Sequence, residues 1–223
     1  MDLVESNLTV ILPTLNEEGA IGQVIDEIRS LPGFSCDILV VDSSSDNTYN
    51  IASSRGVHLI SVPPNGKGYA IKKALEVVKT PYVIMMDADY TYPAQYIKII
   101  FGRLSGGYGA VIGYRKWKDK DSISLINLVG NKLLSLLASI LYRRKVYDVC
   151  SGMWGFRKDI LDRFILKSNG FTLEAELFIN TIKSDCKFIQ IPISYRARLS
   201  GSKAKLKVWD GFKISWFLIR RKT

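Results

Sequence analysis

The sequence predicts an α/β fold in which helices cover both faces of a mostly parallel sheet. Three features of residues 1–110 predict it: short apolar runs rich in β-branched residues, helical spacing of apolar residues between the runs, and connections of only a few residues. Continuous apolar runs are typical of strands that are buried on both faces. Because right-handed crossovers bring the loops that follow parallel strands to one edge, polar residues in these loops should share a cleft.

The expected elements follow one another along the whole chain, which we interpret as a single domain over residues 1–223. Its 47% hydrophobic content is ample for a core. The expected strands cover residues 8–12, 37–42, 57–60, 83–86, 109–115 and 188–193, and the expected helices cover 17–30, 48–55, 66–78 and 123–142, with a further helix within 205–221.

Two carboxylates stand at the end of one of these strands. The apolar run Val83–Met86 ends in Asp87, Ala88 and Asp89. Open parallel sheets hold their ligands at this end of the strands. Two carboxylates so close together repel each other unless a cation lies between them, and Mg²⁺ takes one or two carboxylates plus phosphate oxygens. The motif therefore predicts a metal–diphosphate site; a surface loop that happens to carry two aspartates is the alternative.

Two further loops carry residues suited to a nucleotide. Asp42 ends the second expected strand and suits hydrogen bonding to a ribose or a base. Gly66, Lys67 and Gly68 form a glycine-rich turn at a helix start, where exposed amides and the helix dipole attract phosphate. A plain turn remains the alternative for this second segment.

Charge divides the chain into two halves. Residues 1–110 hold 8 Lys/Arg against 12 Asp/Glu, whereas residues 111–223 hold 23 against 9. This asymmetry indicates that the second half binds an anionic partner, either a nucleic acid or a lipid surface. A solvated basic face without a partner is the alternative. Three widely spaced cysteines argue against a disulfide framework and a zinc site, and they fit a reducing compartment. The N-terminus lacks the pattern of a signal peptide.

Taken in this order, the motifs resemble the nucleotide-sugar domain of family 2 glycosyltransferases, with dolichyl-phosphate mannose and glucose synthases as the nearest likeness. The resemblance implies a Rossmann-like GT-A fold, inverting transfer and a required Mg²⁺ or Mn²⁺. It implies that Asp87 and Asp89 lie at the sugar diphosphate and the metal, with Thr91 where several relatives have a further glutamine ligand. The implied donor-binding residues are Pro13, Asn16, Glu17, Asp42, Ser44, Lys67, Gly68, Asp87, Ala88 and Asp89.

The resemblance extends into the second half, which it makes the acceptor half. Arg115 ends an expected strand and matches a family arginine that binds acceptor phosphate, although a strand-end salt bridge is the alternative. Ser151 lies in a segment that approaches the acceptor in relatives. Arg198 is our choice for a second phosphate contact, with Arg196 as the alternative, and Lys203 completes the implied acceptor set.

Two segments predict helices that lie in a membrane interface. Residues 123–142 are the most apolar stretch, but Asn127, Asn131 and Ser135 form a polar stripe and Lys132 lies mid-segment, which disfavours a span. A buried core helix is the alternative. Residues 203–223 interleave aromatic and basic residues, which suits anionic lipid rather than nucleic acid. We expect a cytoplasmic protein peripherally attached to the cytosolic face of a membrane, with an anchoring partner as an option.

The leading hypothesis is transfer of a hexose from a nucleoside-diphosphate sugar to a polyprenyl or dolichyl phosphate, with Asp87, Asp89, Arg115 and Arg198 as the catalytic residues. GDP-mannose is favoured as donor, and UDP-glucose and UDP-N-acetylglucosamine are the alternatives. Transfer to a glycan hydroxyl is a rival that needs a carboxylate base, for which Asp148 and Glu176 are candidates. A non-catalytic membrane- or nucleic-acid-binding protein and a sugar nucleotidylyltransferase are rivals of other classes.

Overall fold

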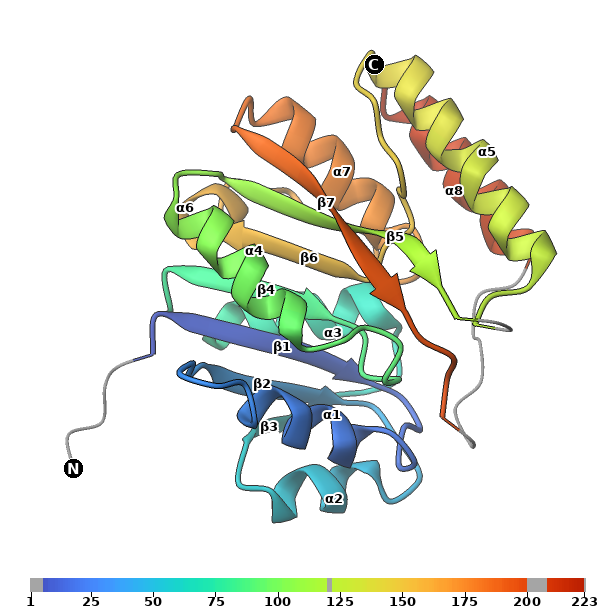
Figure 1. Cartoon of the computed structure of the whole chain (residues 1–223). Helices are drawn as coiled ribbons and strands as arrows, with labels where there is room; N and C mark the ends of the chain where they lie inside the picture. The colour runs from blue at the N-terminus through green and yellow to red at the C-terminus, as the bar shows by residue number, and fades with distance from the viewer. Residues whose placement is uncertain (1–5, 120–121, 200–207, 223) are drawn as a thin grey trace.

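The computed structural model describes residues 6–119, 122–199 and 208–222, and its strands form one seven-stranded sheet (Figure 1). The expected strands are present, and most extend a few residues beyond the expected bounds. The strands are β1 Leu8–Thr14, β2 Asp37–Asp42, β3 His58–Ser61, β4 Tyr82–Met86, β5 Ala110–Lys118, β6 Met153–Arg157 and β7 Phe188–Tyr195.

The helices occupy the segments between these strands. Helix α1 begins later than expected because the backbone first makes a turn on the carbonyl of Glu17, which accepts from Ala20 and Ile21. The helices are α1 Ile21–Arg29, α2 Thr48–Ser54, α3 Lys67–Val77, α4 Gln95–Ser105, α5 Leu125–Tyr142, α6 Lys158–Leu161, α7 Leu173–Lys183 and α8 Val208–Arg220.

The sheet has the strand order β3-β2-β1-β4-β6-β5-β7. All pairs are parallel except those of β6, which lies antiparallel between β4 and β5. The expected strands include none between residues 115 and 188, so β6 is a strand that the sequence analysis missed. Its middle residue Gly155 breaks the apolar pattern: a Cβ there would lie 2.2 Å from Cγ2 of Ile100 on α4. The sheet is therefore mixed but mostly parallel, as expected.

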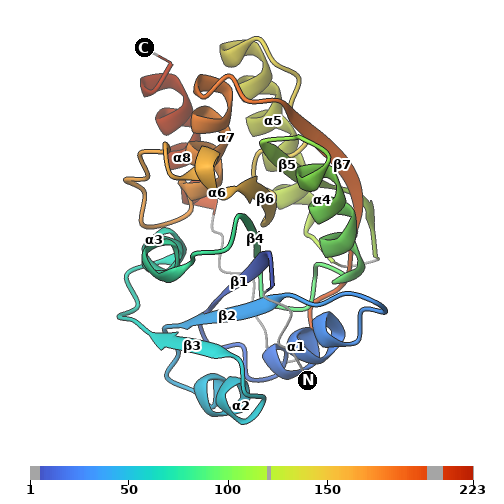
Figure 2. The same ribbon diagram turned by 90° about the vertical axis from the view of Figure 1, so that its left-hand side faces the viewer.

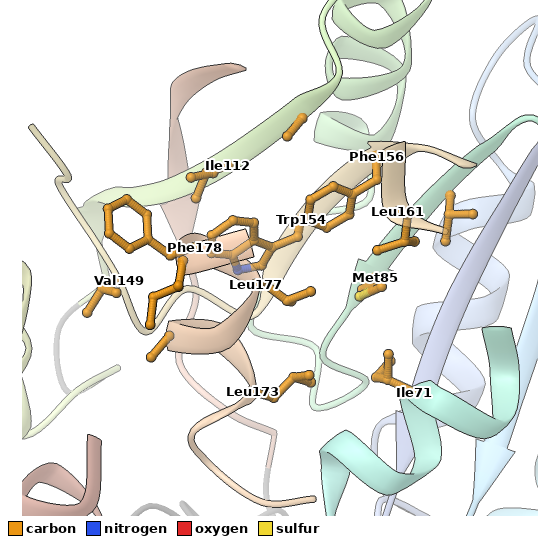
Figure 3. Packing of buried hydrophobic residues seen from close by; sticks show 14 of the residues in the cluster. Ile71, Met85, Ile112, Val149, Trp154, Phe156, Leu161, Leu173, Leu177 and Phe178 are labelled. Carbon is orange, nitrogen blue, oxygen red and sulfur yellow. The ribbon is translucent and has the colours of Figure 1, made fainter. Parts of the chain in front are cut away.

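Each face of the sheet carries its own hydrophobic core. Alternate residues of β1 point to opposite faces, so Val10 packs with α1 and α4 while Ile11 packs with α3. On the α3 side the stacked rings of Trp154 and Phe156 lie against α7 (Figure 3). Helices α1, α2 and α4 cover one face, and α3, α5, α6, α7 and α8 pack on the other.

Helices α5 and α8 lie side by side as an outer layer beyond the sheet (Figures 1 and 2). The hydroxyl of Tyr142 on α5 donates to the carbonyl of Leu218 on α8 at 2.9 Å. By length and composition α5 could cross a membrane. Only 17% of it is buried in the protein, which differs from the buried core helix that was the alternative. The outward sides of the pair form what we call the α5/α8 apolar face: Leu125, Ile126, Val129, Leu133, Leu136, Ile140, Trp209, Phe212, Trp216 and Ile219.

Candidate active site

A cavity of about 660 Å³ opens at the edge of the sheet where the parallel strands end. Its lining includes the loops after β1, β2 and β4, the start of α3, the end of β7, and one side of α5 and of α8. This confirms the expectation that the loops after the parallel strands share one cleft. Of the expected site residues, the cavity is lined by Pro13, Glu17, Lys67, Asp87, Ala88, Asp89, Arg115 and Arg198.

Lys67 joins two carboxylates in this cavity. Its Nζ lies 2.5 Å from Oδ1 of Asp87 and 2.6 Å from Oε1 of Glu174, the second residue of α7. Burial alone lowers the pKa of a lysine, but the charges of both partners outweigh it and raise the pKa of Lys67. Lys67 is therefore a fixed cation beside the first aspartate of the motif.

Asp89 has a cation of its own. Nε of Arg198 donates to Oδ2 of Asp89 at 2.8 Å, and Nη2 of Arg198 donates to the hydroxyl of Tyr195 at 3.1 Å. The other carboxylate oxygen accepts from the hydroxyl of Thr91 at 2.5 Å and from the Thr91 amide at 3.3 Å. Thr91 is fully buried and does not line the cavity, so its hydroxyl orients Asp89 rather than facing a ligand.

The arrangement of carboxylates fits a divalent ion bound together with a diphosphate. Within the described residues no group of three or more His, Cys, Asp or Glu side chains gathers as a closed metal centre. Asp87 and Asp89 both line the cavity, and each is balanced by a cationic side chain. Mg²⁺ and Mn²⁺ accept such an open site because phosphate oxygens and waters supply the remaining ligands.

The glycine-rich turn has a different role from the one that we expected. The amides of Gly68 and Tyr69 donate to the carbonyl of Asn169, at 2.7 and 3.3 Å. A Cβ at Gly66 would lie 2.4 Å from this oxygen, and one at Gly68 would lie 2.3 Å from the carbonyl oxygen of Ser168. The expectation that Gly68 binds donor phosphate is therefore wrong, because the chain itself occupies the start of α3. The glycines allow close approach of this loop, and of the turn's residues Gly66 and Lys67 line the cavity whereas Gly68 does not.

Replacing Gly68 with alanine should lower the free energy of unfolding by about 1–3 kcal/mol, because the new methyl group overlaps a backbone carbonyl that cannot move independently. Urea denaturation measures the change. Gly102→Ala is the matched control: Gly102 lies exposed on α4 with open space around its Cα, so alanine should stabilise the helix by up to about 1 kcal/mol. Equal stability of wild type and Gly68→Ala would contradict this role.

Three of the expected donor residues, Asp42, Asn16 and Ser44, do not line the cavity. Asp42 is 2% exposed, and its carboxylate accepts from the hydroxyls of Thr14 at 2.7 Å and Ser44 at 2.6 Å. The side-chain oxygen of Asn16 accepts from the amide of Ser45 at 2.9 Å. These bonds join the loop after β1 to the loop after β2. The structure thus places Asp42, Asn16 and Ser44 as a frame, whereas Pro13 and Glu17 face the cavity.

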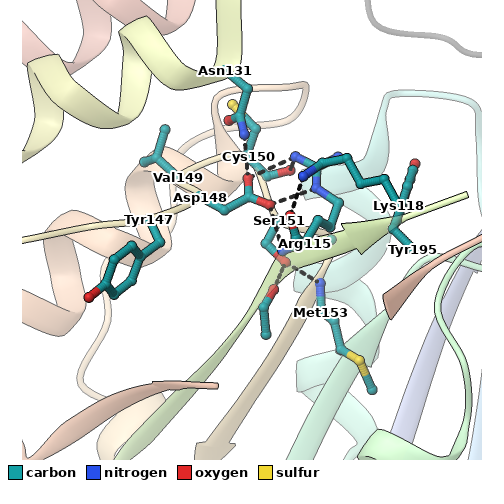
Figure 4. Close-up of polar contacts among 12 residues, drawn as sticks. Arg115, Lys118, Asn131, Tyr147, Asp148, Val149, Cys150, Ser151, Met153 and Tyr195 are labelled. Atoms are coloured by element: carbon teal, nitrogen blue, oxygen red, sulfur yellow. Dashed lines mark hydrogen bonds and ion pairs between the residues drawn. The ribbon is translucent and has the colours of Figure 1, made fainter. Parts of the chain in front are cut away.

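Arg115 is held by a buried carboxylate (Figure 4). Nε and Nη2 of Arg115 donate to the two oxygens of Asp148 at 2.6 and 2.7 Å, and the guanidinium lies 5.1 Å from the centre of the Tyr195 ring. Asn131 on α5 donates to the same carboxylate at 2.8 Å. Burial raises the pKa of Asp148, but the charge and hydrogen bonds of Arg115 outweigh it, so the pKa lies below its usual value. The salt bridge that was the alternative for Arg115 is present, and Arg115 still lines the cavity.

Other expected contacts lie outside the cavity. Ser151 is fully buried and its hydroxyl donates to the carbonyl of Gly113, so an acceptor contact by this side chain does not fit the structure. Nη1 and Nη2 of Arg196 donate to the carboxylate of Glu27 on α1 at 2.8 and 2.9 Å. Of Arg196 and Arg198, it is therefore Arg198 that lines the cavity. Lys203 and residues 205–207 of the second interfacial helix lie outside the described residues.

The structure also adds residues that the sequence analysis did not include in the site. Tyr195 lies between the two arginines, and Glu174 rather than Glu176 faces the cavity. A Cβ at Gly152 would lie 2.0 Å from Oδ2 of Asp87, so this glycine lets the backbone approach the motif. For Asn131 the sequence did carry a signal, the polar stripe on its helix. This stripe faces the protein: Asn131 donates to Asp148, and the hydroxyl of Ser135 accepts from the amide of Val149 at 3.0 Å.

The chain belongs to glycosyl transferase family 2, whose family model matches residues 9–165. It is similar to a dolichyl-phosphate hexose transferase of Haloferax volcanii, with 32% identity over 88% of this chain and 86% of that protein. A dolichol-phosphate mannosyltransferase of Pyrococcus furiosus is 26% identical over 90% of this chain and 59% of that protein. Membership of the family supports a glycosyltransferase over the non-catalytic and nucleotidylyltransferase alternatives.

Solved structures confirm the GT-A fold. The glucosyl-3-phosphoglycerate synthase of Mycobacterium tuberculosis, crystallised with Mn²⁺, UDP-glucose and phosphoglyceric acid, superimposes with a TM-score of 0.74 and 22% identity over 98% of this chain and 79% of that one. The mannosyl-3-phosphoglycerate synthase of Rubrobacter xylanophilus gives 0.74 and 21% identity over 96% and 72%. At these identities the likeness shows the fold. The family match and the similarity to a dolichyl-phosphate hexose transferase identify the protein as a family 2 hexosyltransferase.

Proposed function

We propose that this protein transfers a hexose, with inversion, from a nucleoside-diphosphate sugar to a polyprenyl phosphate of the dolichyl type. The observation that carries the proposal is the composition of the cavity, which is lined by the carboxylates of the Asp87/Asp89 motif, by the guanidinium groups of Arg115 and Arg198, and by apolar side chains of α5 and α8. The first group suits a metal-bound diphosphate, the second a phosphate monoester, and the third a hydrocarbon chain. The similarity to a dolichyl-phosphate hexose transferase supports the same acceptor.

The carboxylates of the site suit an acceptor that needs no base. A phosphate monoester is already anionic at pH 7, whereas a glycan hydroxyl requires a carboxylate to take its proton. Of the candidate bases, Asp148 is bound by Arg115 and Asn131 and has a lowered pKa. Glu176 accepts from the amides of Lys167 and Ser168 and does not line the cavity. Both are poorly placed as bases, and Glu174, which does line the cavity, is paired with Lys67 at 2.6 Å, which favours the lipid phosphate over a glycan hydroxyl.

Six charged side chains of the cavity have a place in this reaction. Asp87 and Asp89 would hold Mg²⁺ or Mn²⁺, which when bound neutralises charge on the leaving diphosphate. Arg198 and the Nη1 group of Arg115, which takes no part in the bonds to Asp148, hold the acceptor phosphate in line with the anomeric carbon. Lys67 and Glu174 border the space beside Asp87 that the transferred sugar occupies.

The proposal also specifies which nucleotide sugar is the donor, and calorimetry tests this choice. GDP-mannose is our first choice, with UDP-glucose and UDP-N-acetylglucosamine as competitors. Titration of each sugar nucleotide into the protein with Mn²⁺ should give one strong binder, and the same nucleotide should donate radiolabelled hexose to dolichyl phosphate. Binding of none of the three, or labelling of soluble glycans in place of dolichyl phosphate, would contradict the proposed function.

The α5/α8 apolar face supports a membrane-bound acceptor. Trp209 and Trp216 are 75% and 65% exposed on α8, and basic residues flank α5 at Arg143, Arg144 and Lys145. Aromatic side chains with flanking cations suit the headgroup level of an anionic bilayer, where each cation contributes about 1 kcal/mol. We therefore propose that the protein works at the cytosolic face of a membrane as a peripheral protein, with or without an anchoring partner.

Changing Trp209 and Trp216 together to serine should weaken binding to vesicles that contain anionic lipid, because the variant loses two exposed aromatic anchors without disturbing the core. We expect a loss of roughly tenfold or more in the partition coefficient, measured by flotation. Ile99→Ser is the control, since Ile99 is an exposed apolar residue of α4 on the opposite face of the sheet. Equal flotation of all three proteins would contradict a membrane role for the face.

A further inference from the structure

We propose that the hydrocarbon chain of the acceptor enters the active site between α5 and α8, over Gly130 and Gly211, and that these two glycines determine whether a lipid is accepted. The inference rests on the proposed function and adds the path that the lipid takes. It starts from the cavity, which does not end at the arginines but continues as far as these two helices.

The far end of the cavity is apolar and leads to the outside. Leu134 on α5 and Ile214 on α8 are 7% and 2% exposed and form its inner wall. Ile126 lines the same cavity yet is 69% exposed, as part of the α5/α8 apolar face. A residue that belongs to both surfaces marks the mouth of the cavity. The mouth therefore opens on the surface that we place against the membrane.

Two glycines keep this end open. Gly130 and Gly211 line the cavity, and a Cβ built on either would meet no atom within 4 Å. Glycine costs a helix roughly 1 kcal/mol relative to alanine, so neither residue is there to support its helix. Neither is required for close packing, in contrast to Gly66 and Gly68. What these glycines provide is unfilled space along the cavity wall.

The polar end of the same cavity carries atoms that lack partners. Ser122 is 3% exposed and lines the cavity, and within the described residues its hydroxyl has no hydrogen-bond partner; the same holds for the buried Oδ1 of Asn131. Buried polar atoms of folded proteins are normally paired, so these two point to polar atoms of a ligand. The hydroxyl of Ser122 can donate, so together with Arg115 and Arg198 it suits a phosphate head group, whereas Oδ1 of Asn131 accepts and needs a donor.

A single occupant matches both ends. A molecule with an anionic head and a flexible apolar tail places its phosphate at the arginines and its tail along the open wall of Gly130 and Gly211. A lipid phosphate that stays in a bilayer has to leave the site on the side of the α5/α8 apolar face, which is where the mouth lies. A soluble phosphate ester matches the head-group end alone and leaves the apolar end unused.

Replacing the two glycines with leucine tests the proposed lipid path by filling it with a side chain. Gly130→Leu and Gly211→Leu place a side chain in the proposed path, while Gly102→Leu adds the same side chain to open space on α4. Leucine favours a helix over glycine at all three positions, so the variants should fold. Transfer of radiolabelled hexose to farnesyl phosphate should fall by roughly tenfold to a hundredfold in the first two variants, through a higher KM for the lipid, and stay unchanged in the third. Calorimetric binding of the sugar nucleotide should be the same in all.

A second measurement does not depend on turnover. Farnesyl phosphate that carries a terminal benzophenone should cross-link to peptides of α5 and α8 in the wild-type protein and much less in the two glycine variants. Cross-linking elsewhere, or wild-type KM values in both variants, would overturn the proposed path while leaving the proposed function intact. Cross-linking at α5 and α8 without any sugar transfer would have the opposite meaning: the path would stand and the proposed function would fail.

Discussion

Asp89→Asn should abolish the dependence of nucleotide binding on a divalent ion and lower sugar transfer by roughly a thousandfold. Asparagine keeps the shape of the side chain but removes the charge that would hold the ion. It also removes the ionic partner of Arg198, which lies 2.8 Å away in the wild-type protein. Titration of GDP or UDP with and without Mn²⁺ measures the first effect, and transfer of radiolabelled hexose measures the second.

Asp26→Asn is the matched control for this substitution. Asp26 also pairs with an arginine, Arg55 at 3.0 Å, but on the exposed surface of α1 away from the cavity. Exposed pairs contribute little, so both readouts should remain at the wild-type level. If Mn²⁺ strengthened nucleotide binding equally in Asp89→Asn and in wild type, Asp89 would not be part of a metal site.

Arg115→Gln should impair folding stability and activity together, because Arg115 serves both. Its side chain and that of Asp148 are 9% and 4% exposed, so removal of the arginine leaves a buried carboxylate with too few partners. Breaking a buried ion pair in this way costs about 3–5 kcal/mol. Urea denaturation measures the loss, and transfer assays at a temperature where the variant is folded measure the effect on the acceptor KM.

The double variant Arg115→Gln with Asp148→Asn separates the two roles. A neutral pair of similar shape avoids the buried unpaired charge, so stability should return most of the way to wild type while transfer remains impaired. In wild type the charge and hydrogen bonds of Arg115 hold the pKa of Asp148 below its usual value, so the stabilisation by this pair is present above the unfolded pKa and is lost as the pH falls through the folded pKa. Full activity in the double variant would show that Arg115 does not bind the acceptor.

Much of the fold was predictable because local signals and the global arrangement agree. The runs that end at Asp42 and at Met86 are continuous and apolar, and the loops after them are polar, so strand ends and cleft follow from the sequence alone. Strand β6 was not predictable in this way. It has five residues, it is interrupted by Gly155, and it is stabilised by pairing with β4 and β5, which lie far away in the chain.

The site was predictable where a side chain reaches the cavity directly and not where the chain contacts itself. Asp87, Asp89, Lys67, Arg115 and Arg198 face the cavity as expected. Gly68 and Ser151 have the residue types of ligand contacts, but they serve approaches between segments that are about 100 and 40 residues apart. A single sequence does not reveal such long-range contacts. The partner of Arg115 was likewise unforeseen, although Asp148 had been considered as a base.

The most direct test of the central claim is transfer of radiolabelled hexose by the purified protein with Mn²⁺, with dolichyl phosphate in vesicles and a soluble glycan offered side by side. We predict a labelled lipid phosphate, lost on chelation of the metal and in Asp89→Asn. Label in the glycan and none in the lipid would contradict the account.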